Sequence, residues 1–202
     1  MKRPAGRAAV FLDKDGTLVR NVPYNVDPAR VEFTDGAARG LARLAEAGYA
    51  LIVVSNQPGV ALGYFSPSAL DALAHHLRER LADAGVFLTG FYACPHRPTS
   101  RTGTPAACAC RKPAPGLLQR AARDHGIALE GSWMVGDILD DVEAGRRAGC
   151  RTVLLDVGSE TEWRVSPLRT PTLRARDLAH AAHSILREDS ALAARRSVSE
   201  PA

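Results

Sequence analysis

Short apolar runs alternate with segments of helical periodicity along most of the chain. The apolar runs predict buried strands over residues 8–12, 49–55, 87–94, 132–136 and 151–157. Between and after them, apolar residues recur every three or four positions, which predicts helices over 35–48, 66–85, 114–126, 140–149 and 176–186. Strands that are apolar throughout and alternate with helices indicate a parallel sheet covered on both faces. We therefore expect a doubly wound α/β fold.

Capping residues define the expected helix ends. Asp35 is expected to be the N-cap of the first helix, and Pro67 lies in the first turn of the second. After the last predicted helix the chain becomes polar. With 202 residues, the sequence fits one domain over 1–188 and a disordered tail over 189–202.

Polar side chains follow the predicted strands where each strand ends. They are Asp13, Asp15, Ser55, Asn56, Gln57, Asp137, Asp140 and Asp141. Lys112 lies just before the helix predicted at 114–126. In an open parallel sheet, ligands bind beyond the carboxyl ends of the strands, so these groups should meet at one edge. Carboxylates together with hydroxyl, amide and ammonium groups predict a site for Mg²⁺ and a phosphate ester.

Asp13 and Asp15 stand two positions apart directly after the first strand, in "FLDKDGT". An ordinary Asp-rich turn is one explanation. The other is phosphoryl chemistry, in which Asp13 attacks phosphorus and Asp15 exchanges protons with the leaving alcohol and with water. A neighbouring carboxylate raises the pKa of one group, so one can be neutral near pH 7 while the other is ionised. Thr17 is expected to cap this loop or to hydrogen-bond within it.

Four segments, "FLDKDGTLV", "VVSNQPGV", "CRKPAPG" and "GDILDD", resemble in order and spacing the four motifs of the haloacid dehalogenase-like phosphatases. The resemblance covers about residues 8–157 and implies that family's Rossmann-like fold. It also implies that Asp13 is the nucleophile and a Mg²⁺ ligand. Asp15 resembles the general acid/base, with its backbone carbonyl also on Mg²⁺.

The same resemblance implies further roles in the site. Ser55 and Asn56 resemble the donors that hydrogen-bond the phosphoryl group, and Lys112 resembles the cation that balances its charge. Asp137 resembles a Mg²⁺ ligand. Asp141, rather than Asp140, resembles the supporting acid.

A second group of metal-ligand residues surrounds a loop rich in Pro, Gly and Thr. Cys94, His96, Cys108 and Cys110 offer three thiolates and one imidazole, which suits a closed structural zinc site. Three buried thiols and a solvated histidine are the alternative, although such a loop offers little core in which to bury thiols. Zinc would order the segment 94–110, which leads directly into Arg111 and Lys112 and would so position these cations.

The zinc loop and "NVPYNVDPARVEF" resemble more narrowly the D-glycero-D-manno-heptose 1,7-bisphosphate 7-phosphatases and the related histidinol-phosphate phosphatases. This resemblance implies a minimal cap, with Arg111, Asn56 and Gln57 as substrate contacts. A guanidinium group binds a second phosphate well because it can donate two parallel hydrogen bonds. Two positions depart from the pattern: Lys14 stands where many members have arginine, and Ile138 where many have lysine.

The sequence therefore predicts a Mg²⁺-dependent phosphatase that hydrolyses the C7 phosphate of heptose 1,7-bisphosphate through an aspartyl-phosphate intermediate. Histidinol phosphate or another small sugar phosphate is the alternative substrate. A silent module that binds a phosphorylated ligand is the alternative class of protein. Phosphoryl transfer from ATP is disfavoured because the chain has no G-x-x-x-x-G-K-[ST] loop.

Composition limits the partners of the protein. The net charge is +4, which suits a small anionic substrate. The arginines are scattered and not interleaved with aromatic residues, so nucleic acid is not predicted. No apolar run is long enough to cross a bilayer, and the N-terminal one is too short for a signal peptide. We expect a cytoplasmic monomer that acts on a small phosphorylated sugar and has no membrane partner.

Overall fold

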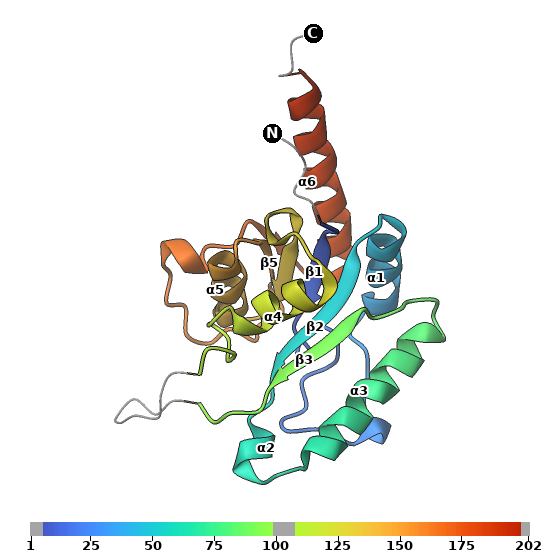
Figure 1. The fold of residues 1–202 in the computed structure, drawn as a ribbon, viewed down its shortest axis with the longest axis vertical. Helices are drawn as coiled ribbons and strands as arrows, with labels where there is room; N and C mark the ends of the chain where they lie inside the picture. The colour runs from blue at the N-terminus through green and yellow to red at the C-terminus, as the bar shows by residue number, and fades with distance from the viewer. Residues whose placement is uncertain (1–5, 99–107, 199–202) are drawn as a thin grey trace.

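The computed structural model describes residues 6–98 and 108–198 and contains a six-stranded parallel sheet (Figure 1). The strands are β1 (Ala9–Leu12), β2 (Ala50–Asn56), β3 (Gly90–Cys94), β4 (Trp133–Gly136), β5 (Arg151–Leu155) and β6 (Leu173–Ala175). Their order is β3-β2-β1-β4-β5-β6, and every neighbouring pair is parallel. From β1 the chain adds β2 and β3 on one side, and it then crosses to add β4, β5 and β6 on the other side. The strand order therefore switches between β1 and β4, and folds of this kind bind ligands at such a switch point. The predicted doubly wound α/β fold is confirmed.

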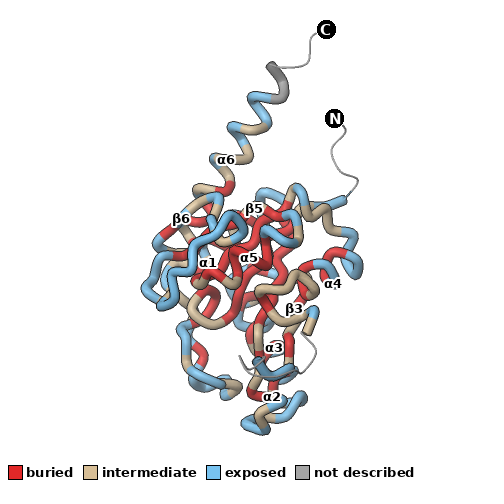
Figure 2. Tube along the Cα trace, turned by 90° about the vertical axis from the view of Figure 1, so that its left-hand side faces the viewer, coloured by how far each residue is buried: buried red, intermediate tan, exposed pale blue. Residues whose placement is uncertain are grey.

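Helices cover both faces of the sheet. One face carries α1 (Ala37–Glu46), α3 (Pro67–Ala82) and α6 (Leu178–Val198), and the other carries α4 (Gly116–His125) and α5 (Leu139–Ala148). Successive strand residues point to opposite faces, so the residues of β1 divide between two apolar clusters. The buried residues lie in the strands and the inner sides of the helices (Figure 2).

Some short elements have no counterpart in the prediction. They are α2 (Gly59–Leu62), β6 and the 3-10 helices at Pro28–Arg30, Leu129–Gly131 and Pro167–Arg169. The predicted N-cap of α1 is wrong, because Gly36 occupies that position with a φ of 75°. The Asp35 side chain is 93% exposed and faces Arg20 at 3.6 Å instead. A left-handed residue is needed there, and glycine adopts it at little cost.

Helix α6 is longer than the prediction of 176–186 and continues through residues 189–198 of the segment expected to be a disordered tail. Its far end projects away from the sheet (Figure 1). Asp189 accounts for part of this extension, because its carboxylate accepts a hydrogen bond from Tyr49 and pairs with Arg151 at 2.5 Å. Residues 199–202, and residues 99–107 of the predicted zinc loop, lie outside the described residues.

The sequence predicted that no segment crosses a membrane. Over residues 6–98 and 108–198, each helix is too short or too polar to cross a bilayer.

Candidate active site

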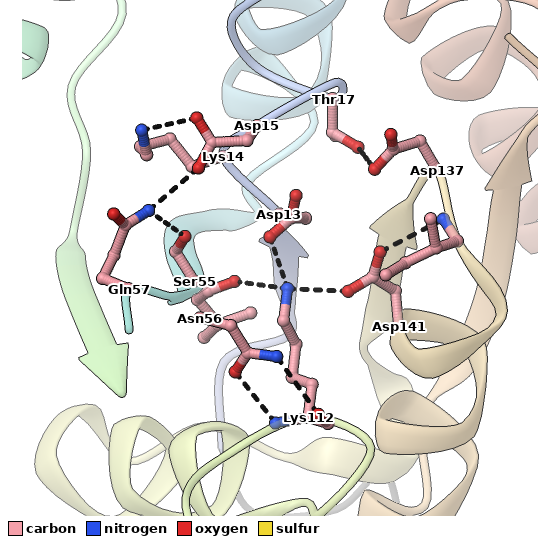
Figure 3. A network of polar contacts seen from close by, with 12 residues as sticks. Asp13, Lys14, Asp15, Thr17, Ser55, Asn56, Gln57, Lys112, Asp137 and Asp141 are labelled. Carbon is pink, nitrogen blue, oxygen red and sulfur yellow. Dashed lines mark hydrogen bonds and ion pairs between the residues drawn. The ribbon is translucent and has the colours of Figure 1, made fainter. Parts of the chain in front are cut away.

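The carboxyl ends of β1, β2 and β4 place the predicted site residues together (Figure 3). Asp13 follows β1 and continues the sheet ladder, because its N–H donates to Val135 O at 2.9 Å. Ser55 lies in β2, and Asp137 follows β4. Lys112 reaches the same point from the segment before α4. These groups therefore meet at the switch point between β1 and β4.

Lys112 is the central cation of the site. Its side chain is only 2% exposed, and its Nζ donates to a carboxylate oxygen of Asp13, to Asp141 Oδ1 at 2.6 Å and to Val54 O at 3.0 Å. Burial by itself would lower the pKa of Lys112, but the two carboxylates outweigh it and raise that pKa. The ammonium group is therefore charged at neutral pH and is fixed between two acids.

Asp15 lies beside Asp13 but has different partners. Lys14 Nζ contacts one carboxylate oxygen at 2.6 Å, and Gln57 Nε2 donates to the other at 2.9 Å. The pKa of Asp15 is raised, with burial as the largest cause, Lys14 opposing it and the charge of Asp13 reinforcing it. The sequence predicted a raised pKa for one member of this pair but attributed it to the neighbouring carboxylate instead of burial.

Asp13, Asp137 and Asp141 form a compact group of acids, with one carboxylate oxygen of each lying within 4.8 Å of the others. Burial and the charge of Asp13 raise the pKa of Asp137 to about 6. Lys112 contacts Asp13 and Asp141, which leaves the group short of positive charge. Clustered carboxylate oxygens that one lysine cannot neutralise fit a hard divalent cation such as Mg²⁺.

Glycine is required where the loop after β1 passes the acid group. Gly16 has a φ of 87°, and a Cβ at this position would lie 2.0 Å from Asp137 Oδ2. The neighbouring Thr17 donates from its hydroxyl to Asp137 Oδ1 at 3.2 Å. Its partner is therefore the acid that follows β4, whereas the sequence predicted a cap or hydrogen bond within the loop.

Asn56 and Gln57 use their amides inside the protein. Both polar atoms of the Asn56 side chain bind the backbone of Lys112, at 3.0 and 3.1 Å. Gln57 Nε2 donates to Asp15 and, at 2.9 Å, to Ser55 Oγ. In this structure the two amides hold site residues in place, and the substrate contacts that the resemblance implied for them stay a prediction.

Several other charged residues lie in or beside the site. Sequence reasoning gave Lys14 no part in the chemistry, yet its buried ammonium pairs with Asp15. Asp140 and Asp141 are adjacent, but Asp140 turns away to Arg169 at 2.6 Å while Asp141 faces Lys112. Arg111 is partly buried, and its NH1 atom has no hydrogen-bond partner among the described residues.

The cysteine and histidine residues of the predicted zinc loop form a second cluster. One ligand atom from each of Cys94, His96, Cys108 and Cys110 lies within 4.8 Å of the others. All three cysteines are free, with sulfur atoms 3.7 Å apart for Cys94 and Cys108. Burial opposes ionisation of Cys108, but hydrogen bonds from Cys110 and its neighbours lower its pKa to about 6. Three thiols and one imidazole at this spacing fit the ligand set of a structural zinc ion.

Comparison with known proteins agrees with this arrangement. Residues 109–181 match the family model described as HAD-hydrolase-like. The D-glycero-beta-D-manno-heptose-1,7-bisphosphate 7-phosphatase of Haemophilus ducreyi is 40% identical over 151 residues, which are 74% of this chain and 83% of that protein. The chain belongs to the heptose-bisphosphate phosphatase family of haloacid dehalogenase-like hydrolases. The recognition made from the four sequence motifs is therefore confirmed.

Other members of this family extend the comparison. The D-glycero-alpha-D-manno-heptose-1,7-bisphosphate 7-phosphatase of Photorhabdus laumondii is 35% identical and aligns with 75% of this chain and 84% of its own. The crystal structure of the D,D-heptose 1,7-bisphosphate phosphatase from B. bronchiseptica, complexed with magnesium and phosphate, superposes with a TM-score of 0.72. It is 30% identical and covers 90% of this chain and 99% of that one. The family thus includes relatives named for either anomer.

Proposed function

We propose that the protein is a Mg²⁺-dependent phosphatase that removes the C7 phosphate of D-glycero-D-manno-heptose 1,7-bisphosphate. The observation that carries this proposal is the buried Lys112 ammonium, which lies between Asp13 and Asp141 at the switch point of the sheet. Asp15, with a raised pKa, stands next to this group. The names of the relatives in the same family support the substrate class.

The first half of the proposed reaction transfers the phosphoryl group to the protein. A carboxylate oxygen of Asp13 attacks phosphorus, and the bond between phosphorus and the C7 oxygen breaks. Asp15 donates its proton to the departing alkoxide, which its raised pKa favours. Lys112 offsets the negative charge of the nucleophile and the phosphoryl oxygens, and Ser55 donates a hydrogen bond to one of those oxygens.

The second half releases inorganic phosphate. Asp15, now ionised, accepts a proton from a water molecule that attacks the phosphorus of the aspartyl phosphate. The bond between phosphorus and the Asp13 oxygen breaks, which restores the carboxylate. Asp13 and Asp137, with the backbone carbonyl of Asp15, would hold Mg²⁺, which neutralises the phosphoryl oxygens during both steps.

The C1 phosphate would require a cation of its own. Arg111 has a buried guanidinium nitrogen without a hydrogen-bond partner among the described residues, and it precedes Lys112. A buried charged donor is costly to leave unpaired, so an anionic ligand group at this position would be bound strongly. This feature favours a bisphosphate over histidinol phosphate, which has a single phosphate.

The substrate is tested by measuring phosphate release with Mg²⁺ from the α and β anomers of heptose 1,7-bisphosphate and from histidinol phosphate. We expect turnover of a bisphosphate anomer, and we expect Arg111→Met to raise its KM by about 10- to 100-fold, the loss of a charged hydrogen bond. The exposed Arg123→Met is the matched control and should leave KM unchanged. Preference for histidinol phosphate would contradict the substrate, and no Mg²⁺-dependent release would contradict the activity.

We further propose that the cluster of Cys94, His96, Cys108 and Cys110 binds one structural Zn²⁺ ion. Metal analysis of the purified protein should find about one Zn²⁺ per chain. Cys108→Ser should lose this zinc. The variant should also unfold at a lower temperature, because a structural metal contributes its binding energy to folding. Cys150 is a buried thiol outside the cluster, so Cys150→Ala is the control that should retain the metal. A wild-type protein without zinc would contradict this proposal.

A cytoplasmic location and a monomeric state complete the proposal. The expected substrate is a small phosphorylated metabolite, and the sequence offers no nucleic-acid motif.

A further inference from the structure

Helix α5, which follows the predicted metal ligand Asp137, begins without a side-chain cap from its own N-cap residue. Its N-cap residue is Ile138, whose side chain has no hydrogen-bond acceptor for the free N–H groups of the first turn. Asp137 comes directly before this cap, and Asp141 lies in the first turn. The position of both acids therefore depends on how the start of α5 is held.

A residue far along the chain provides the missing acceptor. Glu160 Oε2 accepts the N–H of Leu139, the first residue of α5, at 2.7 Å. Its other oxygen accepts the N–H of Glu162, also at 2.7 Å, so both oxygens of the carboxylate are engaged. A carboxylate at a helix N-terminus is favoured by hydrogen bonding and by the helix dipole together.

The segment after β5 is otherwise exposed. Residues 156–158 and 161–168 are all exposed to solvent, whereas Ser159 and Glu160 between them are partly buried. The Ser159 hydroxyl lies near the Asp137 carboxylate and opposes the rise in the pKa of that acid. The segment thus turns inward only where it meets the start of α5 and the acid that precedes the helix.

A second attachment fixes the other end of this segment. Arg169 NH2 binds Asp140 Oδ1 at 2.6 Å, and Arg169 Nε binds Glu143 Oε2 at 2.7 Å. Both acids lie in α5, the helix whose Asp141 contacts Lys112. The segment is therefore joined to α5 before and after its exposed stretch, which limits how far Glu160 can move from Leu139.

We propose that Glu160 is a positioning residue for the Mg²⁺ site. It holds the first turn of α5, and through it the Asp137 carboxylate, at the location where the cation is bound. This inference rests on the proposed function, because it takes Asp137 to be a metal ligand. In this proposal Glu160 acts through the helix and not as a ligand, because each of its oxygens accepts a backbone N–H.

This role is tested by measuring the affinity for Mn²⁺, used in place of Mg²⁺, by electron paramagnetic resonance without substrate. The Mn²⁺ binding that is lost in Asp137→Asn is the binding at this site. Glu160→Ala should weaken that binding by about tenfold, the lower end of the effect of a residue that orients a metal ligand, because it acts through the backbone. Glu160→Gln keeps one acceptor oxygen and should bind Mn²⁺ nearly as the wild type does.

Glu162→Ala is the matched control, since its side chain is 71% exposed and pairs with Arg164 in the same segment. Mn²⁺ affinity should not change in this variant. Unchanged affinity in folded Glu160→Ala would overturn the inference alone, whereas a wild type that binds no Mn²⁺ would overturn the proposed function as well. If the alanine variant does not fold, Glu160→Asp serves instead, because its shorter side chain cannot reach Leu139 N and should also weaken binding.

Discussion

Asp13→Asn is expected to lower kcat for phosphate release by about 10⁴-fold or more, because an amide cannot act as the nucleophile. The substitution preserves the size of the side chain and removes one charge from a crowded group of acids. Lys112 keeps its contact with Asp141, so the buried ammonium retains a partner. The loss should therefore be one of chemistry, with the fold preserved.

Steady-state phosphate release and thermal unfolding, measured on the same preparation, separate these effects. Asp83→Asn is the matched control, because Asp83 is exposed at the end of α3 and should leave both quantities unchanged. A folded Asp13→Asn variant with more than a few per cent of wild-type activity would show that another group attacks phosphorus.

Lys112→Met is expected to have the second largest effect and to affect both activity and stability. Removing the cation leaves Asp13 and Asp141 buried without it, and breaking a buried ion pair in this way typically costs about 3–5 kcal/mol. Activity should fall by about 10³-fold, the upper part of the range for removing one electrostatic donor. Urea unfolding gives the stability change, and phosphate release gives the activity.

A double variant distinguishes the two roles of Lys112. In Lys112→Met with Asp141→Asn, one of the buried charges left without a partner is removed, so part of the lost stability should return. Activity should not return, because the cation beside the phosphoryl group is still missing. Recovery of activity together with stability would contradict a catalytic role for the lysine and leave it a structural one.

The sheet and its functional edge could be predicted because both follow from local patterns. Continuous apolar runs such as the one ending at Leu12 identify buried strands, and the polar residues after them necessarily collect at one edge of a parallel sheet. That pattern alone places Asp13, Lys112 and Asp137 at the same edge. The four motifs then identified the family.

The partners inside the site were not predictable, because they depend on side-chain directions and on contacts distant in sequence. The substrate contacts expected for Asn56 and Gln57 stay a prediction, but the sequence does not reveal that these amides also bind Lys112 and Asp15. Glu160 lies in a polar stretch without a motif and reaches α5 only because the segment after β5 folds back. The extension of α6 beyond residue 186 likewise includes Asp189, whose partners Tyr49 and Arg151 are distant in sequence.

The central claim is that phosphate leaves by way of a covalent bond to Asp13. It is tested most directly by mixing the protein with Mg²⁺ and heptose bisphosphate and quenching with acid during turnover. The acyl phosphate is then reduced with borohydride, and the reduced residue is located by peptide mass spectrometry. The account predicts reduction at Asp13, and no reduced residue in the Asp13→Asn variant. Turnover without a reduced Asp13, or reduction of another residue in its place, would contradict it.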